Sequence, residues 1–225
     1  MPPAAPAPGL VRAIGRNDLA AAVVNGVIGS AVFGLPGTIA GLAGTWSPLA
    51  YVLAGAGTLL VVLCFAEVAS RFREAGGPYL YTVNLRGVRA ATWTVNVFTV
   101  AKLLPLLLLA GLGLLAFQPD VFRAQAVAEP DWTQAVLLLV FAYGGFEAPL
   151  IPAGEARDPR RDSAFALLTA MALVTAVYLL LQVALLGLVP GLGGHRAPVA
   201  AGFGALFGPA GLAVASLAAM VSVYG

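Results

Sequence analysis

The sequence predicts an all-helical protein that crosses a membrane about six times. Two observations support this fold class. Hydrophobic residues make up 60% of the 225 residues, and charged residues make up only 10%. The apolar residues also occur in runs of about 20, without the charged face that a water-exposed helix needs. Runs of that length can cross roughly 30 Å of hydrocarbon at about 1.5 Å per residue.

The chain begins with a tail rich in Pro and Ala, residues 1–18, ahead of the first apolar run. The tail has no apolar core of the kind found in a cleavable signal peptide, so we expect the first span to stay attached. Residues 19–225 are predicted to form the transmembrane domain. Its predicted spans lie near residues 19–41, 47–69, 92–116, 133–153, 163–189 and 205–225.

The arginines predict the orientation of the chain. If the N-terminus is cytoplasmic, the cytoplasmic side carries Arg12, Arg16, Arg71, Arg73, Arg86, Arg89, Arg157, Arg160 and Arg161. The outer side then carries Arg123 and Arg196. Because positive charge gathers in cytoplasmic loops, we expect a multi-pass protein of the inner (plasma) membrane with a cytoplasmic N-terminus.

Two predicted spans contain helix-weakening residues near mid-membrane. Gly29 and Ser30 lie about ten residues from the cytoplasmic end of the first span, which is about 16 Å deep. Gly144 and Gly145 lie about twelve residues from the outer end of the fourth span, roughly 18 Å deep. The two spans run in opposite directions, so both breaks are predicted to reach a similar depth.

Broken helices at this depth favour a solute-binding site. Unpaired backbone in hydrocarbon costs several kcal/mol per group, so a break needs protein, water or a bound solute. The first span, restarting near Ala31, would offer N–H groups to an anion, and the fourth, ending near Phe141 and Ala142, would offer carbonyls to a cation. A zwitterion fits both ends, and paired breaks of this kind are typical of secondary transporters.

The predicted substrate-binding residues are Gly29, Ser30, Ala31, Phe141, Ala142, Tyr143, Gly144 and Gly145. An alternative interpretation is that the glycines only allow close helix packing, as in "GTIAG" (37–41) and "GALFG" (204–208). Phe141 and Tyr143 could likewise form a lid over a substrate or pack against neighbouring helices.

Three motifs carry a resemblance to a known family. They are "NGVIGSAVFGLPG" (25–37), "FAEVASRFREAGGPYLYT" (65–82) and "FAYGGFEAPLIPAGEARDPRRD" (141–162). Together they resemble the first-span motif, the end of the second span and the sixth-span signature of the amino acid-polyamine-organocation (APC) permeases. The resemblance implies a five-plus-five inverted-repeat fold and secondary active transport of amino acids or related amines, driven by protons or by exchange.

The order of the motifs departs from that family near Thr82 and Val83. There the second span runs directly into a segment that resembles the approach to the fifth, so the third and fourth spans and the C-terminal spans are expected to be missing. The family's rocking bundle (spans one, two, six and seven) would be kept, and most of the facing wall lost. We therefore expect a cavity open on one side unless another chain supplies spans. Ala31, which replaces a glycine of the usual motif, would narrow that cavity by a methyl group.

Lys102, the only lysine, is predicted to lie roughly 20 Å along a helix from Arg89. A charged lysine facing lipid at that depth costs at least ~3 kcal/mol, so its side chain should face the protein interior. Some proton-coupled APC members have a lysine at this place, and the resemblance implies that Lys102 is the proton-coupling site. A lysine that reaches toward the cytoplasm, or one with a purely structural role, is the alternative.

Glu147 follows the second break and is expected to be a structural or gating carboxylate that caps freed N–H groups or reaches an arginine. Direct contact with substrate is the alternative. The chain has one His, one Cys and no nucleophile or metal-ligand spacing, so we expect no enzyme activity, no cofactor, no metal and no nucleic-acid partner. The expected partners are an amino acid or amine, the lipid bilayer and a chain that supplies missing spans. The competing interpretation is a shortened, non-transporting membrane fragment or subunit.

Overall fold

A computed structural model describes residues 14–69, 88–148, 156 and 158–224. Apart from one isolated bridge between Ile14 and Ala156, the regular structure of these residues is helical. The prediction of an all-helical, polytopic membrane protein is confirmed. The tail through residue 13 and the predicted junction at Thr82 and Val83 lie outside the described residues.

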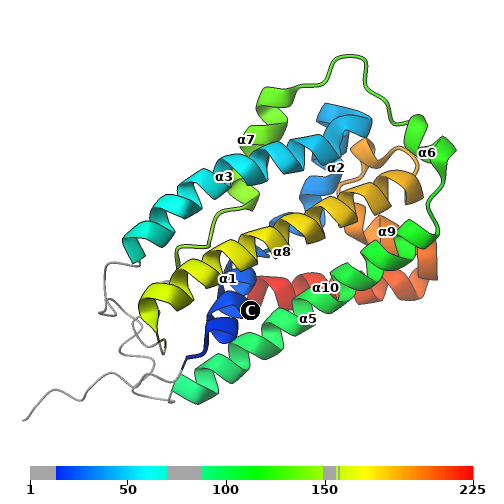
Figure 1. Ribbon diagram of the computed structural model, residues 1–225. Helices are drawn as coiled ribbons and strands as arrows, with labels where there is room; N and C mark the ends of the chain where they lie inside the picture. Colours follow the sequence, from blue (N-terminus) through cyan, green and yellow to red (C-terminus); the bar gives the residue numbers. More distant parts are fainter. Residues whose placement is uncertain (1–13, 70–87, 149–155, 157, 225) are drawn as a thin grey trace, which may run out of the picture.

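Long helices run along the molecule, with shorter ones against them (Figure 1). They are α1 (Arg16–Val27), α2 (Ala31–Ala43), α3 (Ser47–Ala69), α5 (Val88–Leu115), α6 (Pro119–Arg123), α7 (Trp132–Ala142), α8 (Pro159–Leu188), α9 (Pro198–Phe207) and α10 (Pro209–Tyr224). Two 3₁₀ turns accompany them, η1 (Gly44–Trp46) and η3 (Leu192–Gly194). Within the described part of the chain, the stretches long and apolar enough to cross a membrane are Ala31–Val68, Thr92–Leu115 and Arg161–Leu188. Shorter apolar helices are Trp132–Ala142, Pro198–Phe207 and Pro209–Val223.

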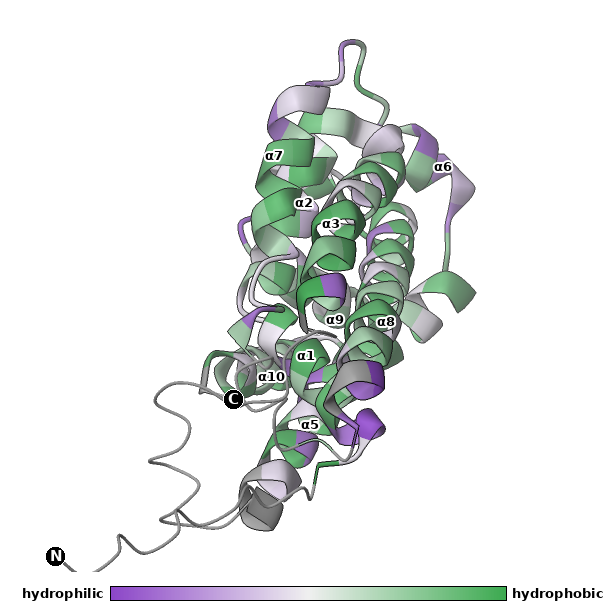
Figure 2. Ribbon diagram, turned by 60° about the vertical axis from the view of Figure 1, so that its left-hand side comes forward, coloured by the Kyte–Doolittle hydropathy of each residue, from purple (hydrophilic) through white to green (hydrophobic). Residues whose placement is uncertain are grey.

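Helix α8 forms the centre of the bundle and packs against α1, α3 and α5. Its buried positions Ala166, Ala170, Val174 and Tyr178 recur every four residues, which keeps them on one face of the helix. The opposite face is also apolar, as expected for a helix that contacts lipid. Figure 2 shows hydrophobic residues along the length of the bundle and hydrophilic residues gathered mostly toward its two ends.

Two spans are broken, as predicted. The first is divided into α1, which ends at Val27, and α2, which begins at Ala31. The fourth stops at Ala142, and Gly145 then adopts a φ of 97°, which a residue with a Cβ rarely adopts. Gly29 with Ser30, and Gly144 with Gly145, thus lie at helix interruptions in the structure.

The sixth predicted span differs from the structure. Residues 205–225 were expected to form one helix, but α9 ends at Phe207 and α10 begins at Pro209. Gly208 between them has a φ of 62° and a ψ of −144°, a conformation that suits glycine and not a helix, and Pro209 suits the first position of the next helix. The continuous helix was therefore a wrong prediction. At the other end of the chain, α1 begins at Arg16, inside the predicted tail.

The helix directions agree with the predicted partition of the arginines. The starts of α1, α5 and α8 lie at one end of the bundle, and α6 lies at the other (Figure 1). Arg16 and Arg161 are therefore at the end opposite to Arg123. Which end faces the cytoplasm stays a prediction.

Gln125 connects the loop after α6 to the C-terminal end of α8. Its side-chain amide donates to the carbonyls of Leu186 and Val189, the latter at 3.2 Å. Its Oε1 accepts a hydrogen bond from the N–H of Leu192 at 2.9 Å. The last carbonyls of a helix have no partner within the helix, so this one side chain satisfies groups that would otherwise stay unpaired.

Replacement of Gln125 by alanine is expected to lower the free energy of unfolding by about 1–3 kcal/mol, because buried carbonyls lose their donor. Thermal unfolding in detergent measures the effect. Gln118→Ala is a matched control, since Gln118 bonds to the Gly187 carbonyl through its backbone N–H, which the substitution keeps. Equal melting temperatures for the two variants would contradict the proposed contact.

Candidate functional site

The two helix breaks contact each other in the middle of the bundle. A Cβ added to Gly145 would lie only 2.5 Å from the carbonyl oxygen of Gly26 and 3.2 Å from its carbonyl carbon. Residues more than 100 positions apart are thus in backbone contact at the two interruptions. The prediction that the breaks face a shared region rested on depth alone, and this contact gives it a geometric basis.

The start of α2 offers N–H groups on a side that is partly open. The first N–H groups of a helix have no partner within the helix, and Ser30 makes no side-chain cap there. Ser30 is exposed, and Ala31 is half-buried against the core. A Cβ on Gly29 would meet no atom within 4 Å. These positions can therefore accept an anion without moving a packed side chain.

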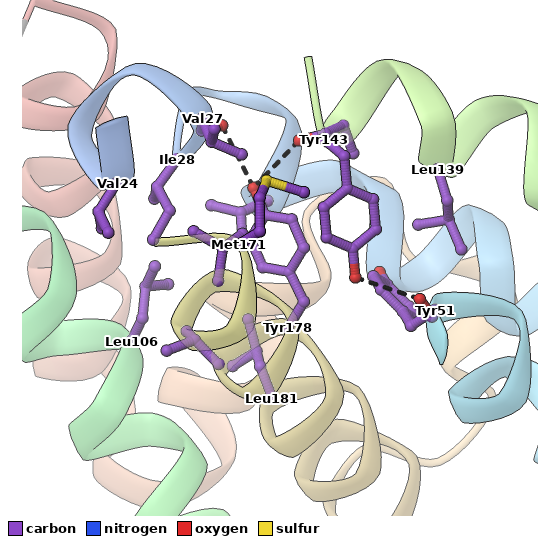
Figure 3. Packing of buried hydrophobic residues seen from close by; sticks show 14 of the residues in the cluster. Val24, Val27, Ile28, Tyr51, Leu106, Leu139, Tyr143, Met171, Tyr178 and Leu181 are labelled. Carbon is purple, nitrogen blue, oxygen red and sulfur yellow. Dashed lines mark hydrogen bonds between the residues drawn. The ribbon is translucent and has the colours of Figure 1, made fainter. Parts of the chain in front are cut away.

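Tyr178 of α8 bonds to both breaks. Its hydroxyl lies 3.3 Å from the carbonyl of Val27, the last residue of α1, and 3.3 Å from the carbonyl of Ala142, the last residue of α7. Figure 3 shows these contacts as dashed lines that meet at one oxygen. The Ala142 carbonyl, which was predicted to face a cation, thus has a neutral hydrogen-bond donor in this structure.

The aromatic residues at the second break point in different directions. Tyr143 is fully buried, its hydroxyl donates to the carbonyl of Tyr51 at 3.2 Å, and its ring lies 5.5 Å from that of Tyr178. Phe141 is 77% exposed. Tyr143 therefore packs in the interior, whereas Phe141 is the one of the two that remains available to cover a solute. Gly144, which follows Tyr143 in the chain, donates its N–H to the Phe141 carbonyl at 3.2 Å.

Lys102 lies in the interior beside the first break. Only 3% of the residue is exposed, and its Nζ donates to the carbonyl of Asn25 in the last turn of α1 at 3.1 Å. The side chain thus turns toward α1 and does not extend along α5 to the end of the bundle. Ser222 of α10 approaches the same break, with its Oγ 3.5 Å from the Ile28 carbonyl.

Glu147 caps the second break. Its exposed carboxylate accepts a hydrogen bond from the N–H of Gly145 at 3.1 Å. This is the contact that a structural carboxylate would make, and it also fixes the chain just after α7.

The side of the breaks that faces α3 is closed. The space between Val32, Ala142 and Tyr178 is too narrow to hold a water molecule. A larger space of about 440 Å³ lies between α3 and α8, but it is lined almost entirely by apolar side chains such as Leu59 and Met171. Among the described residues, no group of His, Cys, Asp and Glu side chains could hold a metal ion.

Comparison with known families decides what kind of protein this is. A family model described as amino acid permease matches residues 81–225, more than half of the chain. The chain belongs to the amino acid permease family. The predicted resemblance to the APC permeases is confirmed, and the breaks, Lys102 and Tyr178 are features of a permease chain.

Three curated relatives show how much of a permease is present. The permease chain is 31% identical over 111 residues to the glutamate/serine transporter AimA of Bacillus subtilis. That alignment covers 43% of the permease chain and 21% of the relative. It is 34% identical over 151 residues to a putative arginine/ornithine antiporter of Escherichia coli. That alignment covers 63% of the permease chain and 33% of the relative. It is 25% identical over 279 residues to cationic amino acid transporter 9 of Arabidopsis thaliana. That alignment covers 86% of the permease chain and 48% of the relative. The chain thus spans less than half the length of these relatives.

The alignments also agree with an internal gap. The comparison with the Arabidopsis transporter runs over 279 residues, more than the 225 that the permease chain contains, so part of that relative has no counterpart here. The family match begins at residue 81, next to the predicted junction at Thr82.

Sequence reasoning missed Tyr51, Tyr178 and Ser222. Each lies in an apolar helix, where a hydroxyl-bearing residue stands out little from its neighbours. The signal that could have found Tyr178 is its depth, because it lies ten residues before the end of the 30-residue helix α8, about 15 Å along the axis.

Proposed function

We propose that the chain carries out secondary active transport of amino acids or related amines across the cytoplasmic membrane, coupled to protons or to exchange. The observation that carries the proposal is the contact of Gly145 with the Gly26 carbonyl, which brings the two broken spans together. Paired interruptions of opposite spans are the usual position of a transporter's substrate site.

In this proposal the substrate carboxylate binds the N–H groups at the start of α2, near Ser30 and Ala31. The substrate ammonium binds carbonyls at the end of α7, near Phe141 and Ala142. The relatives are named as transporters of glutamate, serine, arginine, ornithine and cationic amino acids, and all of these compounds carry both groups. Phe141, the exposed ring, covers the bound substrate, and Glu147 holds the second break in shape.

Lys102 is proposed as the proton-coupling site. Its ammonium holds the Asn25 carbonyl, and loss of the proton would weaken that hydrogen bond and release α1. The cell inner membrane and a cytoplasmic N-terminus complete the proposal, supported by the partition of arginines between the ends of the bundle.

A second chain that supplies further spans is the proposed partner. Ser30 and Phe141 are exposed, and a Cβ on Gly29 or Gly34 would contact nothing, so the breaks are uncovered on one side. Exposed backbone at mid-membrane is unfavourable against lipid. The same observation favours the second candidate function, a subunit that transports nothing until that partner binds.

Uptake into liposomes tests the proposal. The purified chain is expected to accumulate radiolabelled serine, glutamate or arginine above the level of protein-free liposomes, and an inward proton gradient or unlabelled amino acid inside should increase the rate. A gradient effect indicates proton coupling, and an effect of internal amino acid indicates exchange. Absence of uptake for all three labels under both conditions would contradict transport by the chain alone and favour the subunit.

A further inference from the structure

The single hydroxyl of Tyr178 is shared between two helix ends that belong to different spans. It lies 3.3 Å from the Val27 carbonyl and 3.3 Å from the Ala142 carbonyl. The residue is only 2% exposed, so water does not replace either contact readily. A phenol has one proton to donate, so it can bond fully to one of the two carbonyls at a time.

The two acceptors are not equivalent. The Val27 carbonyl also accepts the N–H of Gly29 at 2.9 Å, so it keeps a partner when Tyr178 turns away. Helix α7 ends at Ala142, so the carbonyl of that residue has no donor from a following helical turn. Any movement that separates α1 from α7 therefore removes the tyrosine from one break and leaves it on the other.

The ring of Tyr178 is held in place independently of these bonds. It lies 5.5 Å from the ring of Tyr143 and 6.1 Å, edge to face, from the ring of Tyr51. Helix α8 is continuous from Pro159 to Leu188 and packs on both α1 and α3. The hydroxyl thus extends from a continuous helix to the ends of two interrupted ones.

We propose that Tyr178 is a positioning residue that links the two breaks, so that α1 and α7 change position together during transport. The inference rests on the proposed transport function, and goes beyond it by assigning the mechanical link between the two halves of the site to one hydroxyl.

Tyr178→Phe tests the link because it removes the hydroxyl and keeps the ring. With Cys64→Ser as background, spin labels on Asn17→Cys in α1 and Gln134→Cys in α7 report the distance between the helices, and all three parent side chains are exposed. We expect Y178F to broaden the distance distribution. In liposomes that show uptake, we expect the maximal rate to fall about tenfold, with the apparent KM unchanged.

Thr99→Val is the matched control. It removes another buried hydroxyl, which lies 3.1 Å from the Ala21 carbonyl of α1 and 2.8 Å from the Val95 carbonyl of its own helix, away from the breaks. We expect T99V to keep the parent distance distribution, with a melting temperature close to that of Y178F. An unchanged distribution in Y178F overturns the link, whether or not its rate falls. If the parent chain takes up no amino acid, the proposed transport function fails while the distance measurement still decides the link.

Discussion

Replacement of Lys102 by alanine is expected to abolish the pH dependence of uptake and to lower proton-driven uptake. A hydrogen bond from a charged group contributes about 1.5–3 kcal/mol, which corresponds to roughly ten- to hundredfold in rate. Uptake should change in this way because Nζ of Lys102 is the donor to the Asn25 carbonyl at the first break. An alanine at this position can neither donate to that carbonyl nor carry a proton. Initial rates of labelled amino acid uptake at several external pH values measure the effect.

Lys102→Arg separates coupling from a structural role. Arginine keeps the positive charge and can donate to a carbonyl, but it does not lose its proton in a protein. If Lys102 only stabilises the end of α1, the arginine variant should transport with the parent pH profile. If Lys102 exchanges the coupling proton, K102R should be as defective as K102A. A K102A variant whose pH profile equals that of the parent would remove Lys102 from the coupling mechanism.

Gly145→Ala is expected to separate the two breaks and to abolish uptake. The left-handed φ of 97° alone would cost an alanine roughly 1–3 kcal/mol. The new methyl group would also lie 2.5 Å from the Gly26 carbonyl oxygen, a contact that only movement of the backbone can relieve. We expect a clear fall in melting temperature together with loss of uptake.

Gly111→Ala provides the comparison for that result. Gly111 is an exposed residue in α5, and a Cβ there would meet nothing within 4 Å. Alanine suits a helix better than glycine by about 1 kcal/mol, so G111A should be neutral or slightly stabilising. A G145A variant that melts and transports like G111A would show that the breaks do not depend on close contact.

Backbone chemistry explains which parts of the site could be predicted from the sequence. Gly29, Ser30, Gly144 and Gly145 weaken a helix through their own conformational preferences, so they mark the breaks without knowledge of the neighbours. The position of Lys102 followed from the cost of a charge in lipid, which leaves the interior as the favourable place.

Tertiary contacts explain what the sequence did not predict. Within one helix, the spacing of two residues predicts whether they lie on the same side. Helix α7 ends between Phe141 and Tyr143, so the spacing did not predict that Phe141 is exposed and Tyr143 is buried. Tyr178 and Ser222 acquire their meaning from carbonyls more than 30 residues away. The continuous helix predicted for 205–225 failed because "GALFG" was interpreted as a packing motif, although Gly208 followed by Pro209 is also a helix-ending signal.

The side-chain donors Lys102, Tyr178 and Ser222 share one property: their acceptors at the breaks are main-chain oxygens, those of Asn25, Val27, Ile28 and Ala142. Every amino acid provides such an oxygen, so exchange of these four side chains leaves each acceptor in place. Mutational tolerance should therefore be unequal across each contact. The side chains of the acceptor residues in α1 and α7 can differ among homologues and selected variants without loss of the hydrogen bond. A donor such as Lys102 or Tyr178 can be replaced by few other residues.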